Sequence, residues 1–125
     1  MRFSLDADVN HYSIRQYGPG WITVNDLEIR RSVIITPDQL VLDWPPQTFS
    51  DLEEPHFAVI AALKPEIVLL GTGAHQRFPH PRLTQALLAC GAGVEIMDMS
   101  AACRTYNVIM LEGRRVAAAL LLTVD

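Results

Sequence analysis

The tripeptide Gly71-Thr72-Gly73, which directly follows the apolar run of residues 67–70, has the residue types of an anion-binding turn. Backbone N–H groups at such a turn can point at a phosphate or carboxylate and hold it. The turn lacks the third glycine of a dinucleotide-binding fingerprint, because position 76 is Gln76, and it lacks the lysine of a phosphate-binding loop. Two interpretations stay open: an anion cradle, or a tight strand-to-loop turn packed beneath a helix, which we prefer.

Polar side chains elsewhere could complete such an anion site. Arg104 and Asn107 interrupt an apolar helical stretch and, being three residues apart, lie on the same side of the helix. A buried guanidinium needs a partner, which Asp98 or a bound anion could supply. The alternative is a structural network that ties this helix to the glycine loop, and we prefer it. Arg77 could line the mouth of a pocket over the turn. The candidate anion-binding residues are Gly71, Thr72, Gly73, Arg77, Arg104 and Asn107.

The remaining reactive residue types give weaker signals. Cys103 lies in the first turn of its predicted helix, where the helix dipole can lower a thiol pKa, but the two alanines before it favour a packed core thiol. His75 and His80 flank a short loop with no third metal ligand nearby in the sequence. Paired carboxylates, a nucleophile elbow and a metalloprotease motif are all missing. We therefore predict no metal and no cofactor, and we name no catalytic residue.

The composition limits the class of protein. With 125 residues, of which 50% are hydrophobic and 19% charged, the chain suits a single domain, residues 1–125, with an ample core. A net charge of −4 does not favour binding to nucleic acid or to an anionic membrane, both of which attract positively charged proteins. No apolar run approaches the roughly 18 residues of a membrane-spanning helix. Residues 1–8 have no apolar core, so we do not expect them to act as a secretory signal. The two cysteines, Cys90 and Cys103, fit a reducing compartment, so we expect a cytoplasmic protein.

The second half of the chain must position the candidate residues with α/β elements. Residues 67–70 are four large apolar residues in a row, which is typical of an inner strand buried on both faces of a sheet. Further strands are predicted over 94–97 and 116–122, and helices over 55–63, 82–90 and 101–111, the last capped by Ser100. The first two strands should be parallel with a right-handed crossover. The short connection of residues 112–114 leaves the direction of the last strand open.

The first half predicts an antiparallel β meander. Strands are expected over residues 11–17, 21–24, 27–30 with a continuation through 33–35, and 40–42. Gly18-Pro19-Gly20 and Asn25-Asp26 supply the turns between the first three strands. Next come Trp44, Pro45, Pro46 and Phe49. They form either an exposed apolar patch for a partner or a lid over the core.

Three stretches together resemble a known family: residues 69–73, residues 93–98, and residues 101–108 with the following Glu112-Gly113-Arg114. The chain resembles the small bacterial and archaeal family of unknown function that has the Mth-nine-three-eight-like fold. Its eukaryotic relatives include a mitochondrial assembly factor for respiratory complex I and an adipogenesis-associated protein. The resemblance implies a three-layer α/β domain with a mixed central sheet of five strands, the last antiparallel to the others, and an extra N-terminal β layer. It implies no established enzyme activity.

These observations lead to two expectations about function. The first is a cytoplasmic, non-enzymatic protein that acts through contacts with a protein partner, as an assembly or accessory factor related to complex I assembly. The second is a small-anion-binding domain or uncharacterised enzyme with its site at the Gly71 turn. A pocket at this turn with Arg104 pointing into it would favour the second expectation. A filled turn beside an exposed aromatic patch would favour the first. The sequence identifies neither the partner nor the oligomeric state.

Overall fold

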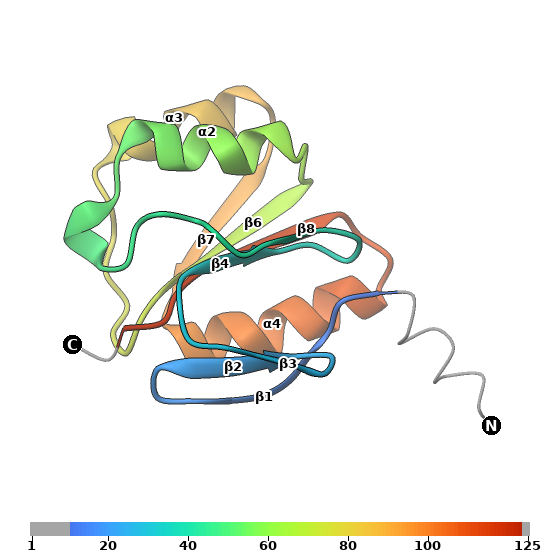
Figure 1. The fold of residues 1–125 in the computed structure, drawn as a ribbon. Coiled ribbons are helices and arrows are strands. Elements are labelled where there is room, and N and C mark those ends of the chain that lie inside the picture. Colours follow the sequence, from blue (N-terminus) through green and yellow to red (C-terminus); the bar gives the residue numbers. More distant parts are fainter. Residues whose placement is uncertain (1–10, 124–125) are drawn as a thin grey trace.

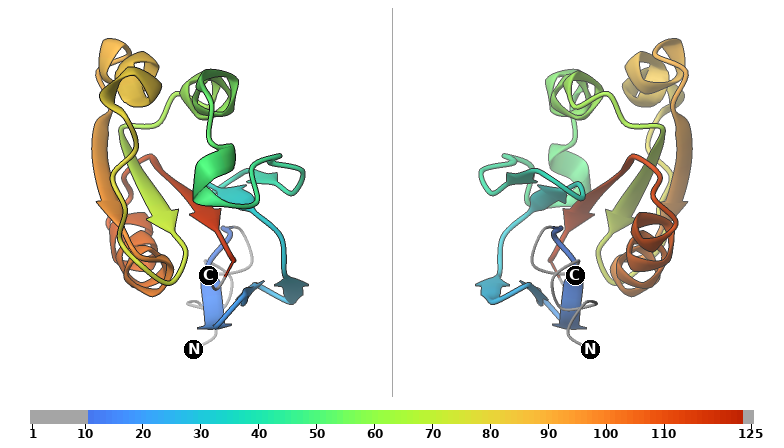
Figure 2. Two further views of the ribbon diagram at one scale, coloured as in Figure 1. Left: turned by 90° about the vertical axis from the view of Figure 1, so that its left-hand side faces the viewer. Right: turned by 90° about the vertical axis from the view of Figure 1, so that its right-hand side faces the viewer.

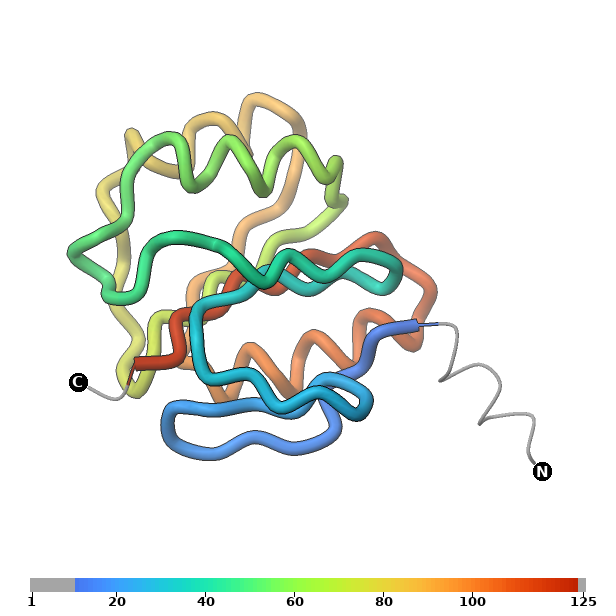
Figure 3. Tube along the Cα trace, in the orientation of Figure 1, coloured from blue at the N-terminus to red at the C-terminus, as the bar shows by residue number. Residues whose placement is uncertain are grey.

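A computed structural model describes residues 11–123, which contain two β-sheets and three α-helices (Figures 1 and 3). The small antiparallel sheet consists of β1 (Ile14–Gly18), β2 (Trp21–Val24) and β3 (Leu27–Ile29). The larger sheet consists of β4 (Val33–Ile35), β5 (Leu40–Val41), β6 (Ile67–Thr72), β7 (Gly93–Met97) and β8 (Val116–Leu121). The helices are α2 (Glu54–Ala62), α3 (Pro81–Ala89) and α4 (Met99–Leu111), and a 3-10 turn, η1 (Phe49–Asp51), precedes them. The predicted α/β fold class, with a mixed five-stranded sheet and an N-terminal antiparallel one, is confirmed.

The larger sheet has the strand order β5-β4-β8-β6-β7. Strand β6 pairs in parallel with both β7 and β8, so it is an inner strand. Val68, Leu69 and Leu70 have no exposed surface, which agrees with the prediction from their apolar run. The glycine turn at the end of β6 therefore leaves the carboxyl edge of the parallel strands, where ligands usually bind in sheets of this kind.

Both faces of the larger sheet are covered (Figures 1 and 2). Helices α2 and α3 lie over one face, and α4 with the small sheet lies over the other. Alternate residues of β6 serve the two faces: Leu70 packs with Phe57 and Leu87 on the α2–α3 side, whereas Leu69 packs with Tyr106 on the α4 side. Each apolar residue of β6 thus contributes to one of two cores.

The direction of the last strand differs from the resemblance-based expectation. Strand β8 is parallel to β6, with Ile67 opposite Val116, and it is not antiparallel to the rest of the sheet. The antiparallel member is β4, which pairs with β8 on its other side. The reason is that α4 connects β7 to β8 and runs back along one face of the sheet. The chain therefore enters β8 at the same end of the sheet at which it entered β6 and β7.

The predicted continuous strand through residues 27–35 is also wrong, because it is two strands in different sheets. β3 ends at Ile29 in the small sheet, and β4 begins at Val33 in the larger one. Leu27 is 45% exposed, whereas all three residues of β4 are fully buried. Residues buried on both sides need cover from two layers, and the larger sheet provides it. The first strand begins at Ile14, so residues 11–13 precede it.

The helix starts follow capping chemistry. Pro55 lies in the first turn of α2, as predicted, where its missing N–H costs no hydrogen bond. Helix α4 begins one residue before the predicted cap: Asp98, and not Ser100, is the N-cap, and its carboxylate accepts the Ala101 N–H at 2.9 Å. Helix α4 has an almost wholly apolar sequence, but Val108 and Leu111 are exposed.

The segment after β5 covers the core and is not an exposed aromatic patch. Trp44 is 1% exposed, and its indole N–H donates to the backbone oxygen of His56 at 3.1 Å. Pro46 is also buried, and Phe49 is half-buried. The lid interpretation of this segment is therefore the right one.

Candidate functional site

Both glycines of the predicted turn have packing reasons. A methyl group on Gly71 would lie 2.8 Å from Leu120 Cδ2 and 3.2 Å from Ala102 Cβ, so glycine lets α4 approach the sheet closely. Gly73 has a φ of +79°, and a Cβ there would lie 2.9 Å from the backbone oxygen of Thr123. Close packing therefore accounts for both residues, of Gly71 beneath α4 and of Gly73 against the segment that follows β8.

The buried hydroxyl of Thr72 organises the loop that follows the turn. It donates to the backbone oxygen of His75 at 2.6 Å and accepts the Arg77 N–H at 3.0 Å. The backbone oxygen of Met97 on β7 is 3.3 Å away. The hydroxyl therefore holds residues 73–77 against the ends of β6 and β7. Its hydrogen bonds are all made to backbone groups of the protein itself.

The amino end of α4, where an anion would bind, is already occupied by groups of the protein. The Met99 N–H donates to Gly73 O at 2.7 Å, and the Asp98 carboxylate accepts the Ala101 N–H and the Ser100 hydroxyl. The Ala101 N–H is the main cause that holds the pKa of the Asp98 carboxyl below its usual range, followed by the Ser100 hydroxyl and the charge of Arg104. The positive end of the helix dipole thus has a carboxylate beside it.

The three other predicted site residues point in different directions. Arg104 is exposed, so the expectation of a buried guanidinium is wrong, and its Nη1 donates to the Tyr17 hydroxyl at 3.2 Å. Asn107 accepts the Ile14 N–H at 3.0 Å and donates to Ile14 O at 2.7 Å, which fastens β1 to α4. The Arg77 guanidinium carbon lies 4.3 Å from the centre of the Phe49 ring. The structure therefore brings only Gly71, Thr72 and Gly73 together.

A hollow of about 450 Å³ does lie beside the glycine turn. Its walls are the β1–β2 hairpin of residues 17–20, the turn at Gly73 and Ala74, the start of α4 at residues 98–100, and Thr123. Arg104 is bonded to Tyr17 of this wall but does not itself line the hollow. The charged side chain in the lining is the carboxylate of Asp98, which repels an anion.

Cys103 is a packed core thiol. The residue has no exposed surface, and burial raises the pKa of its thiol to about 12 despite the opposing charge of Arg104. Its Sγ contacts Met99 Sδ at 3.6 Å. The thiolate that reacts with electrophiles is therefore not formed at neutral pH.

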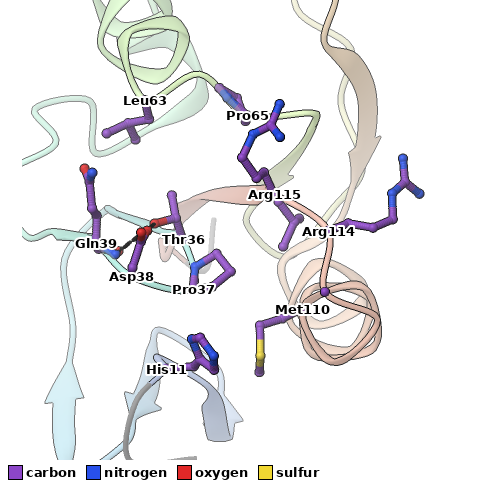
Figure 4. A pocket seen from close by; sticks show the side chains of 12 residues that line it. His11, Thr36, Pro37, Asp38, Gln39, Leu63, Pro65, Met110, Arg114 and Arg115 are labelled. Atoms are coloured by element: carbon purple, nitrogen blue, oxygen red, sulfur yellow. Dashed lines mark hydrogen bonds between the residues drawn. The ribbon is translucent and has the colours of Figure 1, made fainter. Parts of the chain in front are cut away.

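A second hollow, of about 260 Å³, lies at the opposite end of the parallel strands and was missed by the sequence reasoning (Figure 4). Asp38, which accepts the Thr36 hydroxyl at 3.1 Å, and Arg115, whose Nε donates to Lys64 O at 3.2 Å, give it both charges. His11 and Met110 line its other side. The lining comes from segments far apart in the sequence, so no local motif could have predicted this hollow.

A third feature missed by the sequence reasoning is a groove of about 590 Å³ between α3 and β7. It is flanked by two apolar side chains, Phe78 and Leu88, which are 70% and 58% exposed. Its floor includes Val94 and Ile96 of β7, the strand at one end of the larger sheet. The groove is therefore an apolar surface beside a free strand edge.

Residues 11–123 were found to offer neither a metal-binding cluster nor a membrane-spanning helix. That part of the chain contains no cluster of three His, Cys, Asp or Glu side chains with which to hold a metal ion. Among its helices, none has both the length and the apolar surface needed to cross a bilayer; the longest, α4, has 13 residues.

Curated relatives match most of the chain. It is 34% identical over 110 residues to the rat protein named NADH dehydrogenase [ubiquinone] 1 alpha subcomplex assembly factor 3, a match that covers 86% of this chain and 59% of the relative. The chain thus spans less than two thirds of that relative's length. It is 28% identical to the "13 kDa major membrane protein" of Francisella tularensis, with coverage of 86% and 88%.

Solved structures have the same fold. A crystal structure from Bordetella parapertussis is similar with a TM-score of 0.84 at 41% identity, covering 90% of this chain and 96% of the other. A solution structure from Bordetella pertussis, titled a Mth938-like domain, is similar with a TM-score of 0.81 at 34% identity, covering 91% and 87%. The resemblance drawn from the sequence is thereby confirmed. Residues 14–121 match the model of the family described as "Protein of unknown function (DUF498/DUF598)", and the chain belongs to this family.

Proposed function

We propose that this chain is a non-enzymatic assembly or accessory factor that acts through protein contacts in the cytoplasm. One relative supports this proposal by name, because the rat protein is called an assembly factor of NADH dehydrogenase. By that likeness the partner is a subunit of an NADH dehydrogenase or another factor that assembles it. The two free cysteines, one of them exposed, support a reducing compartment.

The observation that carries the proposal is the contrast between the polar and the apolar side chains. The polar groups of Thr72, Asp98 and Asn107 bond to backbone groups of the chain itself. Phe78 and Leu88, in contrast, expose most of their surface beside a strand edge. An exposed apolar surface next to unpaired backbone groups is typical of a protein-binding site.

The test is affinity capture of the tagged full chain after crosslinking in the organism that encodes it, followed by mass spectrometry. Subunits or assembly factors of the NADH dehydrogenase should be enriched over a tag-only control. Deletion of the gene should reduce the amount of the assembled enzyme. Failure to enrich any protein, together with normal enzyme assembly in the deletion strain, would contradict the proposal. Cell fractionation tests the location, for which the name of the Francisella relative suggests the membrane instead.

The second candidate function is the small-anion site proposed from the sequence, with Gly71-Thr72-Gly73, Arg77 and Arg104. Of these residues Gly73 alone lines the hollow beside the turn, and the charged side chain there is Asp98, which disfavours an anion. Thermal melting with and without inorganic phosphate separates it from our proposal. We expect phosphate to protect the wild type and Arg104→Ala equally, because Asp98 already occupies the amino end of α4. Protection of the wild type alone would favour the anion site.

A further inference from the structure

We propose that the free edge of β7 binds one extended segment of a partner protein as an added strand of the larger sheet. The segment would place apolar side chains over the groove beside Leu88 and a basic side chain beside Glu95. This inference deepens the proposed function and rests on it, since it requires a protein partner. It identifies the surface used and the chemistry of the segment recognised.

The backbone of β7 has hydrogen-bonding groups directed away from the sheet. The strand is the last in the order β5-β4-β8-β6-β7, and its Gly93 N–H donates inward to Glu66 O at 3.0 Å. Successive residues of a strand direct their backbone groups to opposite sides, so Val94 and Ile96 direct theirs outward. The side-chain amide of Gln76 donates to Ile96 O at 2.9 Å, where an added strand would donate. One outward acceptor is therefore already met by a strand-like donor.

The two edges of the larger sheet differ in what they offer a partner. Strand β5 at the opposite edge has only two residues, and a strand this short gives few backbone groups for pairing. Strand β7 has five residues and pairs along its whole length with β6. Of the two edges of the larger sheet in residues 11–123, β7 therefore provides the longer template for an extended segment.

The groove next to β7 fits the side chains of such a segment. Val94 and Ile96 are half-buried and belong to the core on the α2–α3 side, and they line the groove together with Leu88 and Phe78. An added strand directs every second side chain to this face. Apolar residues at alternate positions would cover Leu88 and Phe78, which are otherwise exposed to water.

Charge selects the occupant. Glu95 is exposed and borders the groove, but it alternates with Val94 and Ile96 along β7, so its side chain is directed to the other face of the strand. It takes part in none of the salt bridges found in residues 11–123. A lysine or arginine beside it on the added strand would gain a cross-strand ion pair. Glu95 is also the central residue of β7, so the antiparallel register that pairs the two strands of two copies along their whole length would set two Glu95 carboxylates opposite each other, which is unfavourable. The charge therefore favours a basic segment of another protein over a second copy.

The experiment selects binders from a phage-displayed library of random twelve-residue peptides against the full chain. Enriched peptides should alternate apolar residues and carry lysine or arginine between them. Binding of a synthetic enriched peptide should slow amide exchange of Val94 and Ile96, because these N–H groups become hydrogen-bonded. A library that yields no binder, or binders that leave both amides unprotected, would overturn the inference.

A matched pair of variants locates the binding surface. Leu88→Asp puts a charge beside the groove and should weaken the peptide at least about tenfold. Val108→Asp, on α4 and also 58% exposed before substitution, lies outside the groove and should change binding less than about twofold. Phe78→Asp is a second groove variant if Leu88→Asp fails to fold. Equal binding by the groove and control variants would refute the assignment.

Charge reversal tests the role of Glu95. Glu95→Lys should weaken a lysine-containing peptide, and replacing that lysine with glutamate should restore its affinity. Absence of this restoration would remove the charge argument. Sedimentation of the free chain tests the competing occupant, because a dimer that Leu88→Asp dissociates would assign the edge to a second copy. Partner capture by Leu88→Asp as efficient as by the wild type would reject this inference while leaving the proposed function intact, whereas capture by neither would reject the proposed function.

Discussion

The turn at Gly71–Gly73 ends strand β6, and the outer edge of β7 belongs to the strand paired with it, but the two regions use their polar groups differently. At the turn, the Thr72 hydroxyl, the Gly73 carbonyl and the Asp98 carboxylate all bond within the chain. At the edge, Val94 and Ile96 direct backbone groups away from the sheet, and of these the Ile96 carbonyl accepts the side-chain amide of Gln76. Polar residues that suggest a binding site in the sequence can thus have all their hydrogen bonds within the fold. Apolar residues can instead lie on the surface whose backbone groups remain available for hydrogen bonds.

The largest expected effect is on the turn side of this comparison. Gly71→Val should destabilise the fold by about 3 kcal/mol, because the side chain would overlap Leu120 and Ala102 beneath α4. Urea denaturation measures the change. Gly93→Val on β7 is the matched control: its Cβ would have no neighbour nearer than 4.0 Å, so its stability should be close to that of the wild type. Similar losses for both variants would show that packing at the turn is not what distinguishes the two regions.

Asn107→Ala should cost about 2 kcal/mol, since it leaves the N–H and the carbonyl of Ile14 without their partner. Arg104→Ala, three residues earlier on the same helix, should cost less than about 0.5 kcal/mol because the guanidinium is exposed. The same urea titration compares them. A greater loss for Arg104→Ala would reverse the assignment of structural roles to these two residues.

Asp98→Ala should cost about 1 kcal/mol at pH 7, the usual contribution of a helix N-cap. The folded pKa of this carboxyl is lowered, chiefly by the Ala101 N–H, so its stabilisation is fully present above the unfolded pKa of about 3.9. That stabilisation is lost as the pH falls through the lower folded pKa. Unfolding free energies measured from pH 7 to pH 2 should therefore converge for variant and wild type, and a constant difference would contradict the capping role.

The smallest expected effect on stability is on the edge side. Leu88→Asp should change the unfolding free energy by less than about 0.5 kcal/mol, because the side chain is already mostly in water. Leu87→Asp, one residue earlier and without exposed surface, should cost more than about 3 kcal/mol by burying an unpaired charge. Thermal and urea unfolding of both proteins check this contrast. A large loss for Leu88→Asp would mean that the groove belongs to the core.

Local sequence patterns predicted the fold correctly where a pattern is compatible with one structural role. The apolar run at residues 67–70 predicted the buried inner strand, and Pro55 predicted the start of α2. Two residues that can cap a helix, Asp98 and Ser100, stand two positions apart and made the start of α4 ambiguous by two residues. The alternation through residues 27–35 gave no sign that the chain changes sheets, because pairing partners are set by distant residues.

The candidate site was predicted less well for the same reason. Sequence spacing put Arg104 and Asn107 on one helix, but the small sheet determines that Asn107 holds β1 and that Arg104 stays in solvent. Strand order decides that β7 is an edge, and strand order is invisible to a local pattern. The hollow that contains Asp38 and Arg115 likewise joins segments that only the tertiary fold brings together. The anion site itself stays a prediction.

The central position of β8 has a consequence for how the protein is made. This strand lies between β4 and β6, so it joins the two halves of the larger sheet, yet it is translated after both. Until residue 121 has left the ribosome, the pairs β4–β5 and β6–β7 have no strand to connect them. The apolar strands of the nascent chain therefore stay exposed during synthesis. The larger sheet can form completely only after nearly the whole domain has been synthesised.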